Sequence, residues 1–271
     1  MFERAATISD FPALWLTGDL LAPREQETLN GYYASYQRRF PDRLRHYYRR
    51  QIQEVLALIE AWPGARVLEV GCGTRTESLW MAMSDATVEA VELAKARFEV
   101  ANARKALLES DLGRKLNCKF INGTLLDMEA ANQYDIIWME QAFHHLEPRA
   151  QVVEKIAGLL KSGGHVVISE ANALNPLLQA RLFLERGFNT IGEFTDEEGR
   201  RYPYGNEGIL SASRLAKLLG LAGITTVSIE HFRVFPNSPA WDDLLPFEVR
   251  VPGWIRPAFT HYNYVGRKDG Q

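Results

Sequence analysis

A glycine-rich turn, Gly71-Cys72-Gly73, directly follows the segment RVLEV (66–70), whose apolar side chains predict a buried strand. Glycines at the end of a strand let the backbone turn sharply and let a ligand approach the main chain. Residues 76–84 are then predicted as a helix, and the free N–H groups at a helix start favour a ligand there. The sequence therefore predicts a ligand site where this strand meets this helix.

Strand and helix patterns alternate along most of the chain. Short strands separated by single helices are typical of a parallel sheet that helices cover on both faces, so the expected fold class is α/β, a doubly wound Rossmann-like sheet. The predicted strands are residues 66–70, 87–93, 118–121, 134–139, 165–170, 224–230 and 259–266. The predicted helices after the first strand are residues 76–84, 95–109, 148–161, 177–185 and 211–221.

The N-terminal part of the chain differs from this pattern. Residues 1–64 are expected to form a helical extension, because residues 44–62 place apolar side chains at helical spacing and Pro63-Gly64 ends that helix. Residues 65–271 are expected to form the sheet domain. The alternation loosens twice within it, and inserted cap segments are expected near residues 171–208 and 236–257.

Composition limits the partners and the compartment. Hydrophobic residues make up 46% of the 271 and charged residues 24%, which allows a buried core. A formal net charge of −3 is unfavourable for binding a nucleic-acid backbone. Two cysteines without a CxxC motif, no signal-peptide pattern and no long apolar run lead us to expect a cytoplasmic protein without a membrane span.

Two carboxylates accompany the glycine turn. Glu69 lies two residues before the first glycine, and Glu92 lies at the end of the second predicted strand. A dinucleotide-binding turn would have a third glycine at the position of Thr76, so a pyrophosphate ligand is not favoured. A carboxylate at the end of the second strand can accept both hydroxyls of a ribose. Two acids at the ends of two neighbouring strands would therefore suit a nucleoside that carries a cationic amino-acid tail, with one acid for the ribose and the other for the cation.

Five segments, in this order and spacing, resemble the class I S-adenosylmethionine-dependent methyltransferases over residues 65–230. The resemblance implies a seven-stranded, mostly parallel sheet whose last strand is antiparallel. It also implies an enzyme that moves the methyl group of S-adenosylmethionine to an oxygen or nitrogen of a small molecule and releases S-adenosylhomocysteine. The five segments are VLEVGCGT (67–74), VEAVEL (88–93), FINGTLLDM (120–128), YDIIWMEQAFHHL (134–146) and LLKSGGHVVISE (159–170).

The resemblance also implies which residues bind the cofactor. The glycine turn and Glu69 would line the methionine part of S-adenosylmethionine, and the end of the second strand would hold its ribose. An N-terminal helical segment often covers the cofactor in this family, and Tyr32, Tyr33 or Tyr36 would close over it. The other implied residues are Glu69, Gly71, Cys72 and Gly73 for methionine, Glu92 for ribose, Leu93, Thr124 and Leu125 for adenine, and the carbonyl of Glu140 for the ammonium group.

Arg75 departs from the family pattern, which often has a third glycine at its position. Its side chain is expected either to bend the loop or to reach the cofactor carboxylate or an anionic substrate. The departure also supports an alternative, a binding protein that keeps the methyltransferase fold without its activity. The intact Glu69 and Glu92 argue against that alternative, because neither is needed for folding.

His144 and His145 are the candidate catalytic residues. The family often has a His-His-Leu segment here, at the carboxyl edge of the sheet and near the transferred methyl group. A neutral imidazole can act as a general base on a hydroxyl or an amine, and the alternative is that the pair shapes the pocket floor. Methyl transfer from a sulfonium can also rely on proximity in a dry pocket. No third ligand lies at regular spacing, so no metal site is predicted.

The methyl acceptor is expected to be a small molecule. The cap segments are rich in aromatic residues, which predicts an aromatic-walled acceptor pocket, with a hydrophobic cap or a dimer contact as the alternative. Methyltransferases that act on base amines of nucleic acids typically have an Asn/Asp-Pro-Pro-aromatic motif after the fourth strand, and this chain has Met139-Glu140-Gln141-Ala142 instead. The candidate acceptor-binding residues are Gln141, Arg181, Phe183 and Trp241.

Overall fold

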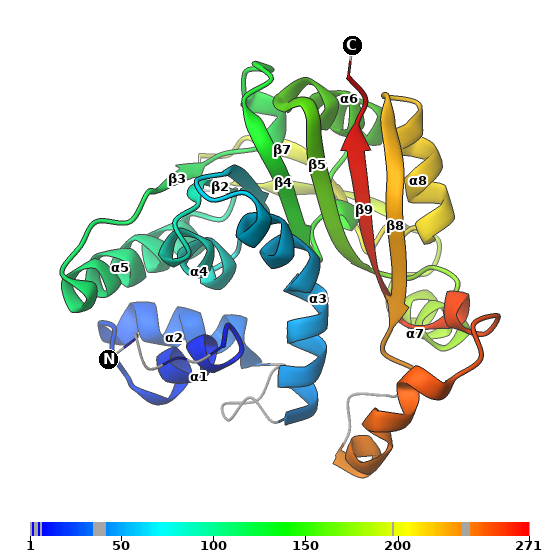
Figure 1. Cartoon of the computed structure of the whole chain (residues 1–271), viewed down its shortest axis with the longest axis horizontal. Helices are drawn as coiled ribbons and strands as arrows, with labels where there is room; N and C mark the ends of the chain where they lie inside the picture. The colour runs from blue at the N-terminus through cyan, green and yellow to red at the C-terminus, as the bar shows by residue number, and fades with distance from the viewer. Residues whose placement is uncertain are drawn as a thin grey trace. The chain divides into compact units, whose positions relative to one another are not determined.

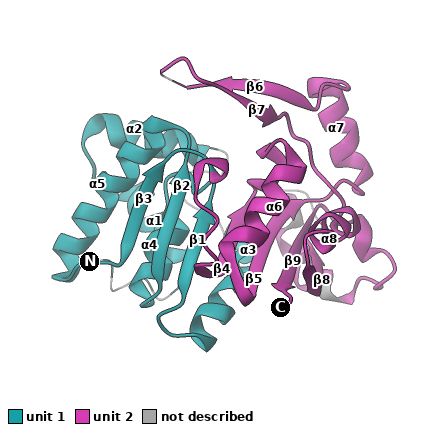
Figure 2. Cartoon of the chain, turned by 90° about the horizontal axis from the view of Figure 1, so that it is seen from above, with its two compact units in different colours: residues 1–124 teal, residues 125–271 magenta. Residues whose placement is uncertain are grey.

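The structure, a computed structural model, describes residues 2, 5, 7–34, 42–196, 198–234 and 239–270, without the side chains of Pro239, Trp241 and Val249. The chain divides into two compact units (Figure 2). Unit 1 comprises residues 1–124 and unit 2 comprises residues 125–271.

Unit 1 contains three parallel strands, β1 (Arg66–Val70), β2 (Thr87–Glu92) and β3 (Cys118–Asn122). Val88 of β2 pairs with Val67 of β1 and with Cys118 of β3. Helix α4 (Thr76–Met83) connects the first two strands, and helix α5 (Lys95–Leu112) connects the second pair. β1 is buried over almost its whole length, which is typical of a parallel strand covered on both faces.

Three helices precede β1 in unit 1, namely α1 (Asp10–Thr17), α2 (Pro23–Tyr32) and α3 (Asp42–Ala61). They pack on the rest of the unit, since α2 lies against α5 and the Phe11 ring of α1 is 5.6 Å from the Trp80 ring of α4. The compact unit therefore includes the N-terminal helices together with β1, β2 and β3, whereas the sequence patterns place a boundary at residue 64.

Unit 2 contains four strands of the main sheet, β4 (Tyr134–Glu140), β5 (Leu160–Ala171), β8 (Ile224–Phe232) and β9 (His261–Lys268). β5 is parallel to β4, and β9 runs antiparallel between β5 and β8 (Figure 1). The helices of this unit are α6 (Arg149–Leu159), α7 (Pro176–Arg186) and α8 (Ala212–Gly220). Segments of 3-10 helix occupy Leu125–Asp127, Phe143–His145, Pro239–Arg250 and Arg256–Ala258.

The seven strands form one sheet in the order β3-β2-β1-β4-β5-β9-β8. The expected fold class is confirmed, because the sheet is mostly parallel and the last strand of the chain, β9, is antiparallel to both neighbours. Among the described residues, no helix has both the length and the apolar character needed to cross a membrane.

A separate hairpin in unit 2, β6 (Ile191–Thr195) and β7 (Arg201–Gly205), was not expected from the sequence, which predicts only a turn-rich segment there. The side chains of β6 alternate between exposed and half-buried, so no strongly apolar face marks the strand. Pro203 lies inside β7 and further weakens the strand pattern. After the hairpin the chain returns to His144, since Oε2 of Glu207 lies 3.7 Å from its Nε2.

β5 begins earlier than the sequence pattern predicts. The helix expected over residues 148–161 ends at Leu159, and β5 follows at once. Gly163 has a φ of 77°, and a Cβ atom on Gly164 would lie 2.9 Å from the carbonyl oxygen of Lys161. These glycines therefore form an irregularity within the start of the strand, where the sequence suggested the end of a helix.

A buried arginine joins the N-terminal helices to the rest of unit 1. Arg104 of α5 is fully buried, and its Nη1 donates to the carbonyl oxygen of Thr74 at 2.6 Å. Its guanidinium lies 4.6 Å from the ring of Trp15 on α1. Burial raises the pKa of the nearby Glu77 carboxyl, while a hydrogen bond from Tyr48 and the charge of Arg104 oppose that shift.

We predict that Arg104→Met lowers the free energy of unfolding by about 3 kcal/mol or more, because it leaves the Thr74 carbonyl and the Glu77 carboxyl without their buried cation. Urea denaturation measures the change. The matched control is Arg66→Met, since Arg66 is 42% exposed and its ion pair with Glu89 contributes about 0–1 kcal/mol. Equal losses in the two variants would contradict the prediction.

Candidate active site

The glycine turn of unit 1 is held against the end of β2 by its own backbone. The N–H groups of Gly71 and Cys72 donate to the carbonyl oxygen of Val91 at 3.0 and 3.3 Å. Gly71 and Gly73 have φ values of 71° and 51°, in the left-handed region. A Cβ atom on Gly73 would lie 2.2 Å from the hydroxyl oxygen of Tyr32. Both the backbone conformation and the available space therefore require glycine at Gly73.

Glu92 is buried at the end of β2, with 5% of its surface exposed. Its Oε2 accepts a hydrogen bond from the N–H of Gly73 at 2.8 Å, and its Oε1 accepts one from the N–H of Ala94 at 2.9 Å. A carboxylate has about four lone-pair sites, so each oxygen can accept a further donor. The carboxylate is thus fixed in position and can still accept ribose hydroxyls.

Glu69, near the end of β1, is also buried. The hydroxyl of Ser78, in the first turn of α4, donates to its Oε2. A buried carboxylate needs such partners to remain ionised. The carboxylate of Glu69 is therefore held toward α4, the helix that follows the glycine turn.

Tyr32, at the end of α2, covers the glycine turn. Its hydroxyl lies over Gly73, and the guanidinium of Arg97 lies 5.3 Å from its ring. Arg97 Nη1 also lies 3.8 Å from Oε1 of Glu92. No sequence motif marks Arg97, although its place in the first turn of the helix after β2 is a usable signal.

Tyr33 packs inside unit 1. It is buried, its hydroxyl oxygen lies 2.5 Å from the hydroxyl oxygen of Thr76, and burial raises its pKa. Its ring meets that of Tyr32 edge to face, with centroids 4.9 Å apart. Of the three tyrosines expected to cover the cofactor, Tyr32 therefore lies over the turn, and Tyr33 supports Tyr32 from the core. Tyr36 lies outside the described residues.

Arg75 turns its side chain into the core of unit 1. It is fully buried, with a φ of 69° that is uncommon for a residue with a side chain. Its guanidinium lies 4.1 Å from the ring of Phe120 and 5.1 Å from the ring of Phe98. Its Nε donates to the sulfur of Cys72 at 3.0 Å. These contacts support packing of the loop, rather than contact with a ligand, as the role of Arg75.

The thiol of Cys72 is buried and donates to the carbonyl oxygen of Val91 at 3.1 Å. Burial raises the pKa of Cys72 well above its ordinary value and raises the pKa of Cys118 to about 12. Both thiols therefore stay protonated at neutral pH. Cys72 packs the glycine turn and offers no thiolate nucleophile.

The residues implied for adenine binding fall on both sides of the unit boundary. Leu93 is half-buried directly after β2, and the side chain of Asn122 donates to its carbonyl oxygen at 3.0 Å. Thr124 ends unit 1, and Leu125 begins unit 2 as a buried residue. The contacts of these three residues with adenine stay predictions.

In unit 2, β4 ends at Glu140, which is half-buried, and Gln141 follows with a φ of 48°. The N–H of Gln141 donates to the carbonyl oxygen of Ser169 on β5 at 2.9 Å. Its side-chain Nε2 is buried and has no hydrogen-bond partner among the residues that the structure describes. A buried amide donor without a partner is costly, so Gln141 has a donor available for a ligand.

His144 is buried in the 3-10 turn after β4 and is held by Glu170 of β5. Its Nδ1 lies 2.6 Å from Oε2 of Glu170, and its backbone N–H donates to Oε1 at 3.2 Å. Burial by itself would lower the pKa of His144, but the carboxylates of Glu170 and Glu207 outweigh it and raise that pKa.

His145 is held by the hairpin. Its Nδ1 lies 2.8 Å from the carbonyl oxygen of Gly205, and its ring stacks on that of Tyr204 with centroids 4.5 Å apart. Burial and the neighbouring His144 lower the pKa of His145. The two adjacent histidines therefore have pKa values shifted in opposite directions.

Glu207, two residues after β7, reaches the same place. Its Oε2 lies 3.7 Å from Nε2 of His144. Sequence reasoning missed both Glu170 and Glu207, because neither stands at regular spacing from the histidines and the hairpin that returns the chain was not predicted. Glu170 ends a segment that the family resemblance matched, and that was its only signal.

The remaining acceptor candidates are less enclosed. Arg181 of α7 is exposed and pairs with Glu185 at 3.3 Å. Phe183 is half-exposed, and its ring lies 5.0 Å from that of Phe188 in an edge-to-face contact. The side chain of Trp241 lies outside the described part of the structure.

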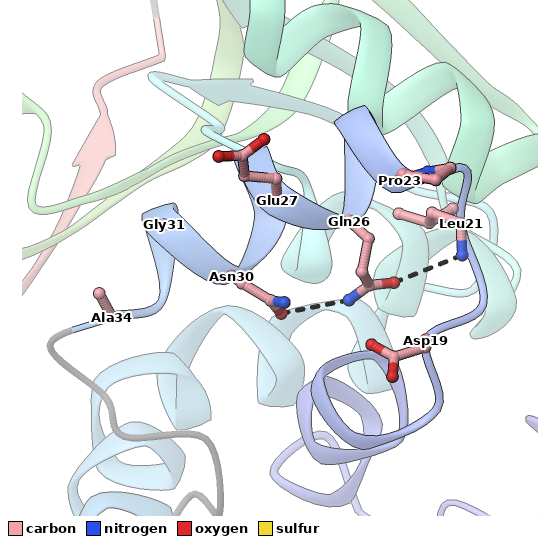
Figure 3. A pocket seen from close by; sticks show the side chains of 8 residues that line it. All are labelled: Asp19, Leu21, Pro23, Gln26, Glu27, Asn30, Gly31 and Ala34. Carbon is pink, nitrogen blue, oxygen red and sulfur yellow. Dashed lines mark hydrogen bonds between the residues drawn. The ribbon is translucent and has the colours of Figure 1, made fainter.

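A cavity of about 770 Å³ lies in unit 1 beside α2 (Figure 3). Gln26 spans one side of it, with Oε1 accepting from the N–H of Leu21 at 3.3 Å and Nε2 donating to Oδ1 of Asn30 at 3.2 Å. None of the site residues predicted from the sequence lines this cavity, so it is separate from the glycine turn. Its lining residues are Asp19, Leu21, Pro23, Gln26, Glu27, Asn30, Gly31 and Ala34.

Residues 68–168 match the family described as "Methyltransferase domain". The ubiquinone biosynthesis O-methyltransferase of Vibrio parahaemolyticus is 28% identical over 193 residues, which cover 70% of this chain and 77% of that protein. The protein of the same name from Marinobacter nauticus is 33% identical over 109 residues, which cover 40% of this chain and 45% of that protein. The chain therefore spans about half the length of the second relative.

A solved structure shares the fold. The magnesium protoporphyrin IX methyltransferase of Synechocystis PCC 6803, with bound SAH, superposes with a TM-score of 0.54 at 15% identity, over 83% of this chain and 85% of that chain. The domain match shows that residues 68–168 form a methyltransferase domain, and the strand order and the solved structure show that the chain has the fold of the class I S-adenosylmethionine-dependent methyltransferases.

Proposed function

We propose that this methyltransferase transfers the methyl group of S-adenosylmethionine to a hydroxyl oxygen on the ring of a small aromatic molecule. The observation that carries the donor half of the proposal is the Glu92 carboxylate, which is buried at the end of β2 and fixed by the N–H groups of Gly73 and Ala94. The choice of a hydroxyl acceptor is supported by the names of the relatives, which are ubiquinone biosynthesis O-methyltransferases.

The residues of unit 1 fit the donor. Glu92 has lone pairs left for the two ribose hydroxyls. Gly71 is exposed at the turn, where a ligand can approach the backbone, and the fixed carboxylate of Glu69 offers charge to the cationic methionine end. Tyr32 would shield the bound donor from water, and Arg97 would hold Tyr32 and Glu92 together.

When bound, S-adenosylmethionine supplies a sulfonium methyl group, so the acceptor oxygen forms a bond to the methyl carbon while the electron pair of the carbon–sulfur bond stays on sulfur. The protein has to align the acceptor oxygen with that methyl carbon and exclude water. Alignment of this kind contributes about 7–11 kcal/mol in the best intramolecular models. We therefore assign the larger part of the acceleration to positioning.

The acceptor hydroxyl must also lose its proton as the new bond forms. We assign this step to the His144–His145 pair, whose Nδ1 atoms are both engaged, so that the Nε2 atoms are the nitrogens that can face the hydroxyl. The unpartnered amide Nε2 of Gln141 would donate to the acceptor and orient it. We also propose a cytoplasmic location, which the two free, buried cysteines support.

We predict that Glu92→Gln raises the dissociation constant for S-adenosylmethionine at least tenfold. Losing hydrogen bonds to a charged acceptor costs about 1.5–3 kcal/mol, which corresponds to roughly 10- to 100-fold in affinity. Isothermal titration calorimetry measures the change.

The matched control for this variant is Glu89→Gln, on the same strand, where the carboxylate pairs with Arg66 at 3.8 Å. The control should bind the donor as the wild type does. Unchanged donor binding by Glu92→Gln would remove the observation on which the donor site rests.

We predict that His145→Ala lowers kcat for methylation of a catechol about 10²- to 10⁴-fold, the range that proton-transfer catalysis contributes, and leaves donor affinity unchanged. Chromatographic detection of S-adenosylhomocysteine and of the O-methylated product measures the rate.

The control for this variant is His231→Ala, a half-buried histidine of β8, which should keep the wild-type rate. Catechol serves as a small aromatic ring with an acidic hydroxyl. A wild-type rate in His145→Ala would show that the pair only shapes the pocket.

A further inference from the structure

The histidine pair of unit 2 has a third possible ligand beside it. One ligand atom from each of His144, His145 and Glu207 lies within 4.8 Å of the others. The two imidazole rings are 3.9 Å apart between centroids, and Nε2 of His144 is 3.7 Å from Oε2 of Glu207. No regular spacing along the chain predicts such a set, since Glu207 comes to the histidines only after the hairpin β6–β7.

Both rings are oriented in the same way. Nδ1 of His144 meets a carboxylate oxygen of Glu170 at 2.6 Å, and Nδ1 of His145 meets the carbonyl oxygen of Gly205 at 2.8 Å. Neither oxygen has a hydrogen to donate when Glu170 is ionised, so each neutral ring carries its hydrogen on Nδ1 and has the lone pair on Nε2. Histidines that bind metals almost always have one nitrogen engaged in this way, which fixes the tautomer and the ring orientation.

The charges around the pair favour a cation. Glu170 is 2% exposed and lies against His144, and the side chain of Glu207 is 42% exposed. Arg149 opposes them, although its Nη2 donates to the carbonyl oxygen of Gly208 and so holds the segment that carries Glu207. A single proton on His144 that pairs with both carboxylates is the alternative to a cation, and the metal titration below distinguishes the two.

We propose that Nε2 of His144, Nε2 of His145 and a carboxylate oxygen of Glu207 bind one divalent transition-metal cation, with Zn²⁺ as the first choice. Two imidazoles and one carboxylate are a ligand set that zinc uses in catalytic sites, where it keeps a further position open. Glu170 is the carboxylate that orients the first histidine, and the Gly205 carbonyl orients the second.

One of the three separations between ligand atoms is already close to what the cation needs, and the other two are at most 4.8 Å. Zinc bonds of about 2.0–2.2 Å place the ligand atoms of a tetrahedral site about 3.3 Å apart. The present separation of 3.7 Å between His144 Nε2 and Glu207 Oε2 is close to that value. The side chain of Glu207 is 42% exposed, so the proposed site is accessible to water, which could fill a further coordination position.

With the cation bound, the Nε2 lone pairs hold the metal and do not accept the acceptor's proton, so the cation would replace the histidine pair in that step, a consequence that rests on the proposed function. A hydroxyl oxygen on the open position would have its pKa lowered, as a zinc-bound water does, and its proton would pass to solvent. Cation binding itself does not depend on methyl transfer, so the two can be tested separately.

The test uses the full-length protein after dialysis against a chelator. Titration with Zn²⁺ by calorimetry should give one equivalent bound, and Co²⁺ should give the visible absorption bands of a low-symmetry site with nitrogen and oxygen ligands. His145→Gln and Glu207→Gln should each weaken binding at least 100-fold. Glu170→Gln, which alters only the partner of a ligand, should weaken it about 10- to 100-fold.

Matched controls come from the same unit. His231→Gln and Glu193→Gln, on β8 and β6, should bind Zn²⁺ as the wild type does. Donor binding by calorimetry, which reports on unit 1, and the thermal unfolding midpoint show that each variant is folded. Glu207→Gln is the decisive variant because a half-exposed side chain can be replaced without loss of the core.

Absence of a stoichiometric Zn²⁺ site in the wild type, or equal affinity in the wild type and Glu207→Gln, overturns the metal site. If the chelated protein still methylates at the full rate while binding no metal, the metal site fails and the proposed function stands. If the cation binds and is lost in the ligand variants but no acceptor hydroxyl is methylated, the metal site stands and the proposed function fails.

Discussion

The hydrogen bonds between the glycine turn and the end of β2 are the contacts on which the donor site depends. The carbonyl of Val91 accepts from the N–H groups of Gly71 and Cys72, and the carboxylate of Glu92 accepts from the N–H of Gly73. The residue proposed to bind the ribose therefore also fixes the loop proposed to bind the methionine end. Because these bonds exist before any ligand binds, the loop loses little conformational entropy on binding, which favours affinity.

The alternation of strands and helices could be predicted from the sequence, because each main strand is a short apolar run closed by turn residues. β1, with RVLEV followed by Gly71, is the clearest example. The hairpin β6–β7 could not be predicted, since its strands are largely exposed and the pairing of Ile191 with Gly205 is not encoded in an apolar pattern. The early start of β5 was missed for a different reason, because Gly163 and Gly164 also fit the end of a helix.

The candidate site, like the fold, could be predicted from the sequence only where local patterns mark its residues. Glu69, Gly73 and Glu92 were found because they stand at fixed distances from strand ends, where local backbone geometry determines what they can do. Glu170 and Glu207 could not be identified, because the long-range pairing that brings their carboxylates to His144 leaves no local pattern. Arg75 shows that a departure from a family pattern can be structural, since its left-handed backbone and its contact with Phe120 make it part of the core.

Both units leave buried polar groups without a hydrogen-bond partner, but at different places, and the difference suggests a division of roles. In unit 1 the N–H groups of Gly71, Cys72 and Gly73, the thiol of Cys72 and the carboxylate of Glu92 have partners, which makes a preorganised site, and the unpartnered guanidinium nitrogens of Arg75 lie against the rings of Phe98 and Phe120. In unit 2 the amide Nε2 of Gln141 has no hydrogen-bond partner among the described residues. Each imidazole of the histidine pair has only its Nδ1 in a hydrogen bond. Buried polar groups left without a partner discriminate strongly between ligands that can satisfy them and ligands that cannot. We therefore expect the residues that select the acceptor to lie in unit 2, on the hairpin β6–β7 and on the turn after β4. These are the segments whose contacts with each other depend least on local sequence.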